Sequence, residues 1–251
     1  MSMQYKGGVL SATALVTSSS SASGMWTMRQ HLQAVSGTGW PAYVVPAATA
    51  IGQPYGGGFI GGKINVSGTI YYLIIGTAVK AGFWGPESSS GGGTLAGTSS
   101  LIDGPTNSAT LKAMGGAFGF THEAAIYCED LTTGGYTDWY LPALNELEVI
   151  YYNLKPTTTA NYTATSSGSN SNAVSPEPAN TNYTSGLPAQ TNIASFRSGG
   201  LNKIPNGNVW TSTEFAAGTA YIQNFDNGAQ STISKDTGVS IWTLPVRRVA
   251  V

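Results

Sequence analysis

The chain has 251 residues, and only 9% of them are charged, against about a quarter in an ordinary soluble protein. Its formal net charge of -1 and its eleven scattered lysines and arginines provide no basic stripe, so we do not expect nucleic acid as a partner. The most apolar run, residues 70–79, has about half the length of a membrane-spanning helix, so we do not expect membrane insertion either.

Gly, Ser, Thr, Asn and Ala fill the sequence, as is typical of extracellular or particle-surface proteins. Residues 1–10 nevertheless contain no apolar stretch of the kind found in a secretory signal, and the single Cys128 fits synthesis in a reducing cytoplasm. Release inside a particle by lysis reconciles the two observations, and we therefore expect a virion protein. A cytoplasmic protein that is poor in charge is the alternative.

Residues 1–50 differ from the rest of the chain in their sequence pattern and are expected to form an N-terminal attachment segment. After a run of serines, four apolar residues are spaced three, four and three apart, which predicts a helix of about three turns. A helix this short is marginal alone and needs a surface to dock against. That surface is either its own domain or a neighbouring virion subunit, and the contact residues would be Met25, Trp26, Met28, Leu32 and Val35.

The next elements predict an α+β domain over residues 51–251. Two β-rich runs, residues 57–64 and 69–75, are joined by a short turn and predict a hairpin. Residues 121–131 and 141–156 predict two helices. In the second, Pro142 suits the first turn and Glu146 lies near the positive end of the helix dipole.

Residues 157–201 form a long polar segment with almost no apolar periodicity. A segment this long without regular structure is usually functional or disordered. Its mixture of Tyr, Asn, Ser and Gly resembles antibody paratopes, in which rings supply contact area and small polar groups supply adaptable hydrogen bonds. The alternative is that these residues pack between the subunits of a homo-oligomer. The expected ligand contacts are Asn161, Tyr162, Asn182, Tyr183, Phe196 and Arg197.

The last third of the chain returns to strands. Residues 207–214 and 242–251 are rich in β-branched or alternating residues, and residues 219–235 predict a hairpin that turns at residues 226–228. An antiparallel arrangement is expected.

Four stretches in this order resemble a bacterial and phage domain family: GGYTDWYLPALNELEVIY from residue 134, VWTSTE from residue 209, AYIQNFDNG from residue 220 and LPVRRVAV from residue 244. This family is the DUF1566-like branch of the C-type lectin fold, with its DW-x-LP motif, W-[ST]-S-[ST] strand, Gly hairpin and VR-x-V end. The resemblance implies a C-type-lectin-like domain with antiparallel strands and two helices. It implies a fold and not an activity.

The motif residues also have a physical interpretation. Trp139 and Trp210 are large apolar groups with one donor each and suit the centre of a small core. Arg247 is expected to pair with Asp138 or Glu146, and the alternative is a set of solvated surface pairs that contribute little. The expected core set is Trp139, Leu141, Pro142, Leu147, Trp210 and Arg247.

The sequence departs from the sugar-binding and enzymatic relatives of this fold. Calcium-binding lectins carry EPN or QPD and WND motifs, whereas this chain has an inserted Ala between Pro178 and Asn180, and VWTST replaces the second motif. The formylglycine-generating enzymes use two cysteines, and this chain has one. No G-x-S-x-G motif supports a serine nucleophile. We therefore expect no catalytic residue, no metal and no cofactor.

The N-terminal stretch GGVLSATALVTSSSSASGMWTMRQHLQAV, followed by GTGWP, is similar to a short lead found on structural proteins of tailed phages, particularly phages of aquatic bacteria. The similarity implies that residues 1–50 bind other virion proteins and lock the chain into a particle.

These observations predict a non-enzymatic virion structural protein, a homo-oligomer that is expected to be a trimer, as phage fibres are. It would act as a tail fibre or adhesin that binds a glycan or protein receptor on the host cell. One alternative is a head or tail decoration protein whose domain is only architectural. The other is an enzyme acting on surface glycans, although no pair of carboxylates in the sequence indicates one.

Overall fold

The computed structural model of the protein describes residues 17–18, 21–22, 50–85, 96–114, 121–164, 167–237 and 240–251. The chain divides into two units, Met1–Thr49 and Ala50–Val251. In the first unit, β1 (Thr17–Ser18) pairs antiparallel with β2 (Ser21–Ala22). The expected attachment helix, with Met25, Trp26, Met28, Leu32 and Val35, lies outside the described residues.

The second unit contains a four-stranded antiparallel sheet. Its order is β11-β5-β4-β3, so a strand from the last part of the chain pairs with the early hairpin. The predicted hairpin is confirmed: Asn65 Oδ1 accepts the Gly68 amide at 2.8 Å, and both Ser67 and Gly68 have positive φ, as a tight turn requires. The strands are β3 (Pro54–Tyr55), β4 (Gly58–Val66), β5 (Thr69–Ile75) and β11 (Val246–Ala250).

A five-stranded sheet follows the order β6-β10-β7-β8-β9. The predicted C-terminal hairpin is confirmed as β8 and β9. One pairing in this sheet is parallel, because β10 runs parallel to β7 through the single pair Trp242 and Val209. The strands are β6 (Lys80–Ala81), β7 (Asn208–Ala216), β8 (Thr219–Asn224), β9 (Gln230–Ser234) and β10 (Trp242–Thr243).

The described residues form three α-helices, so the expectation of two helices was wrong. The two predicted helices are α3 (Glu123–Glu129) and α4 (Leu144–Leu154), and α4 begins two residues after Pro142. The additional helix is α2 (Gly104–Met114). Its buried face has helical spacing but consists mainly of small and polar residues, which hide the usual apolar signal: Gly104, Asn107, Ser108 and Leu111.

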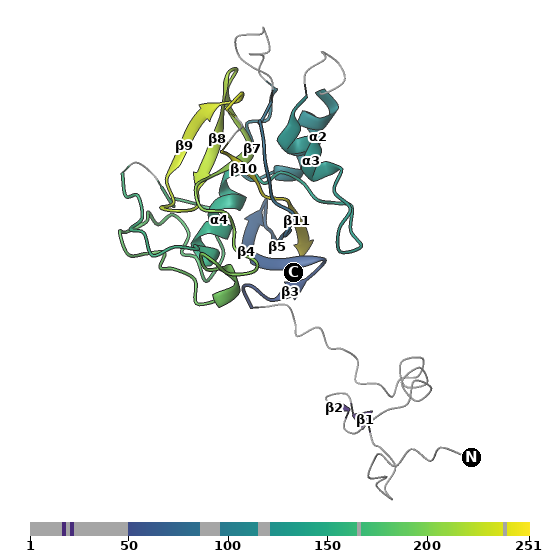
Figure 1. Cartoon of the computed structure of the whole chain (residues 1–251), viewed down its shortest axis with the longest axis vertical. Coiled ribbons are helices and arrows are strands. Elements are labelled where there is room, and N and C mark those ends of the chain that lie inside the picture. Colours follow the sequence, from purple (N-terminus) through teal and green to yellow (C-terminus); the bar gives the residue numbers. More distant parts are fainter. Residues whose placement is uncertain are drawn as a thin grey trace, which may run out of the picture. The chain divides into compact units, whose positions relative to one another are not determined.

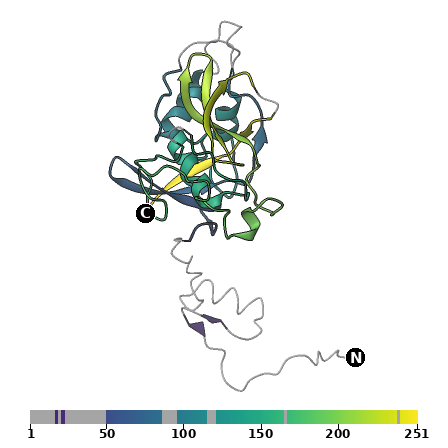
Figure 2. The same cartoon turned by 90° about the vertical axis from the view of Figure 1, so that its left-hand side faces the viewer.

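Helix α4 is the centre of the second unit. It packs against β4 of the smaller sheet and against β7 and β8 of the larger one, and both views show it between these strands (Figures 1 and 2). Helices α2 and α3 lie side by side (Figure 1), and the first residue of α2, Gly104, lies against Glu146 at the start of α4. Because α4 has protein on several sides, almost its whole surface is buried, including the carboxylates of Glu146 and Glu148.

The motif tryptophans lie in the interior of this unit. Trp139 donates its indole N–H to the Thr133 carbonyl at 3.3 Å, and Trp210 donates to the Gly82 carbonyl at 2.9 Å. Leu141, Pro142 and Leu147 are buried as well. The second unit is therefore a mixed α+β domain built mainly from antiparallel strands. No helix among the described residues has the length and apolar character needed to cross a membrane.

Candidate functional site

The long polar segment, residues 157–201, follows α4 directly and runs as loops beside it (green in Figure 1). Its regular structure within the described residues is one short 3-10 helix, η2 (Ala194–Phe196). Buried polar side chains hold much of the segment. Thr157, Asn161, Asn170 and Thr191 bond to the segment itself, to α4 or to a neighbouring turn. The buried polar residues are Thr157, Asn161, Ser167, Asn170, Glu177 and Thr191.

Asn161 is the centre of the first part of this network. Its Oδ1 accepts the Tyr151 hydroxyl at 2.6 Å and the Lys155 ammonium group at 2.7 Å. Its Nδ2 donates to the carbonyls of Thr184 at 3.0 Å and Pro188 at 2.9 Å. All the hydrogen-bonding positions of this one amide are therefore used to tie two loops to the end of α4, and burial lowers the pKa of Lys155 beside it.

Glu148 is the centre of the second part. Its carboxylate accepts the Tyr183 hydroxyl at 2.5 Å and the Asn170 amide at 2.9 Å. The same Asn170 amide group donates to the Asn145 carbonyl at 3.0 Å, and the Asn170 carbonyl accepts the Asn180 amide at 2.9 Å. A single helix position thus organises residues 167–183.

The two NYT triplets of the segment have opposite orientations. In residues 161–163 the asparagine is buried and Tyr162 is 41% exposed. In residues 182–184 the asparagine is exposed and Tyr183 is buried against Tyr151 and Glu148. Asn161 and Tyr183, two of the expected ligand contacts, therefore make internal contacts instead, because each anchors its own loop to α4.

Phe196 and Arg197 likewise serve the interior of the domain. Phe196 is fully buried and packs edge to face on Phe59 of β4, with ring centroids 5.4 Å apart. Arg197 is half-buried and donates from Nε to the Thr191 carbonyl at 2.8 Å within the segment. Phe196 was expected to contact a ligand, and its aromatic surface is instead enclosed by the core.

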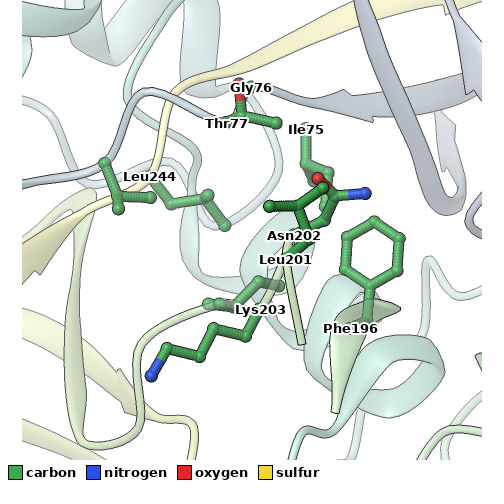
Figure 3. A pocket seen from close by; sticks show the side chains of 10 residues that line it. Ile75, Gly76, Thr77, Phe196, Leu201, Asn202, Lys203 and Leu244 are labelled. Atoms are coloured by element: carbon green, nitrogen blue, oxygen red, sulfur yellow. The ribbon is translucent and has the colours of Figure 1, made fainter. Parts of the chain in front are cut away.

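A small cavity lies at the base of the segment, with Phe196 and Leu244 on opposite sides of it (Figure 3). Ile75 and Asn202 also line it. Its volume is about 40 Å³, which can hold a few water molecules and is far below the roughly 300 Å³ of a small-molecule site. This cavity is too small for such a ligand, so we take the outer surface of the segment as the candidate recognition surface.

The outer surface has a defined backbone framework. The Asn161 amide donates to the Ser185 carbonyl at 3.0 Å, and the Tyr162 amide donates to the Asn227 carbonyl at 2.8 Å. These bonds place residues 161–162 beside residues 184–185 and beside the β8–β9 turn. We call the exposed side chains on and next to this framework the loop face: Tyr162, Thr163, Asn182, Thr184, Ser185 and Leu187.

The two arginines of β11 each form an ion pair within the second unit. Arg247 forms two hydrogen bonds to Asp138, at 2.7 and 2.8 Å, and its guanidinium lies 3.7 Å from the ring centroid of Tyr136. Asp138 is one of the two partners expected for Arg247, and the bond lowers the pKa of its carboxyl group. Arg248 bonds to the fully buried Glu146 at 2.6 Å. These acids are partners of internal arginines.

The sequence did not single out Lys155, Asn170, Glu148 and Glu177 as site residues. Glu148 belongs to a predicted helix and Glu177 to the polar segment. Only the tertiary structure brings these two side chains together. Among the described residues, no three His, Cys, Asp or Glu side chains cluster in a way that could hold a metal ion.

Comparison with protein-family models gave no match, and neither did comparison with curated proteins.

Proposed function

We propose that the chain is a non-enzymatic structural protein of a tailed-phage virion, in which residues 1–50 attach it to other virion proteins and residues 51–251, a C-type-lectin-like domain, are displayed. The loop face then binds a glycan or protein on the host cell, as a tail fibre or adhesin does. A homo-oligomer, a trimer by analogy with phage fibres, would present several such faces.

The observation that carries this proposal is that the long polar segment has two sets of polar side chains, one buried and one exposed. Its buried amides and hydroxyls fix the backbone, and the chemistry left on its surface is an aromatic ring, amides, hydroxyls and two leucines. A rigid base with adaptable polar and aromatic surface groups is the arrangement that paratopes use. Leu187, 58% exposed, adds apolar contact area beside these groups.

A non-enzymatic role agrees with the positions of the buried acids. The buried carboxylates of Glu146 and Glu214 are bonded to Arg248 and Lys235, at 2.6 and 2.5 Å. Glu148 lies under residues 167–183 and is buried by them. A glycan-cleaving site needs two carboxyl groups that face a bound sugar, and these carboxyl groups face the protein interior.

The test is adsorption of phage particles that carry Tyr162→Ala together with Asn182→Ala. Both side chains are exposed, so we expect normal folding and incorporation, with adsorption to the propagating strain reduced about tenfold or more, as for loss of interface hot spots. Phe215→Ala removes from β7, outside the loop face, an aromatic ring that is even more exposed than Tyr162, and should leave adsorption unchanged.

The outcomes separate the candidate functions. Normal adsorption by particles that contain the double variant would favour a decoration protein with an architectural domain. Absence of the wild-type chain from purified particles would refute the virion assignment itself. Release of sugars from host polysaccharide by the purified full-length chain would identify an enzyme.

A further inference from the structure

Glu148 and Glu177 form a carboxyl pair inside the second unit. Glu148 lies on α4 and Glu177 on the long polar segment, and their exposed fractions are 1% and 2%. The two carboxyl groups lie close enough to influence each other's pKa directly. Glu148 also accepts bonds from Tyr183 and Asn170, whereas neither oxygen of Glu177 has a donor among the described residues.

This geometry is incompatible with two ionised groups. Carboxylates accept hydrogen bonds and cannot donate them, so two charged groups in contact would repel each other in a medium of low dielectric constant. None of the ion pairs formed by the described residues includes either glutamate. A proton on Glu177 resolves the conflict, because the protonated group donates to Glu148, which also accepts the bonds from Tyr183 and Asn170.

We propose that Glu148 and Glu177 bind one proton between them and act as a pH-sensitive latch that holds residues 167–183 on α4. The latch joins the loop that carries Asn180 and Asn182 to the central helix. It concerns the folding of the segment and is independent of any receptor.

The electrostatic surroundings support this assignment. Burial raises the pKa of Glu177 well above that of an ordinary glutamate, and its hydrogen bond to Glu148 raises it further. Burial also raises the pKa of Glu148, against the opposing effect of the bonds from Glu177, Tyr183 and Asn170. The extra proton therefore belongs to the pair, with Glu177 as the donor.

The other titratable groups near the pair are tyrosines. Tyr183 of the segment and Tyr151 and Tyr152 of α4 all have pKa values raised by burial. Since an ordinary tyrosine titrates near pH 10, these phenols stay neutral between about pH 6 and about pH 9. A pH response of residues 167–183 in this range is therefore assigned to the carboxyl pair.

The direction of the response follows from proton linkage. The closed segment binds one proton more than the open segment, in which both glutamates have the ordinary pKa of about 4.3. The latch is therefore fully effective below that pH and is progressively lost as pH rises toward the raised pKa. Between the ordinary pKa and the raised pKa, the equilibrium constant for closing residues 167–183 onto α4 falls by up to about tenfold per pH unit.

The experiment is hydrogen exchange of the full-length chain between about pH 6 and about pH 9, expressed as protection factors corrected for intrinsic exchange. In the wild type, protection of residues 167–183 should fall by up to about tenfold per pH unit relative to the β4–β5 hairpin. Glu177→Gln carries an amide that donates to Glu148 without titrating, so its protection should be independent of pH. Glu123→Gln, an exposed glutamate on α3, should behave as the wild type.

Three results would overturn the latch: a flat profile in the wild type, an unchanged slope in Glu177→Gln, or protection that disappears with a chelator and returns with calcium, since a bound cation would then replace the proton. Carboxyl carbon NMR of the wild type provides a second test that does not depend on a variant. One glutamate carboxyl should remain protonated above pH 7, and ordinary titration of every glutamate would refute the proposal.

Discussion

At the scale of single residues, Glu146 shows how one buried charge can connect several elements of this charge-poor domain. Its carboxylate accepts the Ala143 amide and the Tyr140 hydroxyl, both at 2.7 Å, and the Arg248 guanidinium at 2.6 Å. Arg248 also donates to the Ile102 carbonyl. One acid thus caps α4 and joins it to β11 and to the loop before α2, so its loss should be felt in three elements.

Glu146→Gln should lower the free energy of unfolding by about 3 to 5 kcal/mol, because it leaves Arg248 buried without its strongest partner. Urea denaturation followed by tryptophan fluorescence measures this change. The control is Asp130→Asn, whose pair with Lys112 is largely exposed and should not alter the unfolding midpoint. A loss no larger than that of the control would show that the buried pair does not stabilise the fold.

At the scale of elements, the packing of α4 on β4 depends on a glycine. A Cβ atom at Gly62 would lie 2.3 Å from Cγ1 of Val149 and 2.7 Å from Nδ2 of Asn153, closer than packed side chains approach. Val149 is fully buried, so its side chain is enclosed by other residues. The hairpin and the helix can therefore meet this closely only because β4 lacks a side chain there.

Gly62→Ala should destabilise the domain by about 1 to 3 kcal/mol, the usual cost of overpacking, with a lower thermal midpoint in calorimetry. Gly186→Ala is the matched control, since a Cβ atom there meets no atom within 4 Å. It should be neutral or slightly stabilising because it restricts the unfolded chain. Equal midpoints for the two variants would contradict the close packing of β4 and α4.

The elements that were predictable are those with a local signal. The β4–β5 hairpin and α4 have apolar periodicity together with turn or helix-start residues, and both were found. Helix α2 was missed because Asn107 and Ser108 occupy its buried face, where they bond to Ser100 and Leu141. The partners of these buried polar groups are supplied by other elements of the fold, so no local sequence pattern indicates that the groups are buried.

The same limit applied to the candidate site. Composition drew attention to residues 157–201, but it could not tell which of these residues face solvent. Asn161 and Asn182 stand in identical triplets, and only their tertiary partners distinguish the buried anchor from the exposed side chain. The acid pair is another case, since Glu148 and Glu177 are brought together by the fold.

At the scale of the whole molecule, the division at Thr49 and Ala50 predicts independent behaviour of the two units. Both larger sheets and the helices of the described chain belong to residues 50–251, so removal of residues 1–49 should leave the thermal midpoint of this unit unchanged. Calorimetry of the shortened and full-length chains measures this. If residues 1–50 attach the chain to the virion, the shortened chain should also be missing from purified particles, and its normal incorporation would contradict that role.

The pairing of β5 with β11 also governs when the domain can be completed during synthesis. Residues 69–75 leave the ribosome long before residues 246–250, so the outer edge of β5 waits unpaired while the intervening chain is translated. Throughout that interval Asp138 and Glu146 lack their arginines. Nascent chains on neighbouring ribosomes can meet through this open edge, and chaperone protection is therefore most valuable just before translation of the final strand.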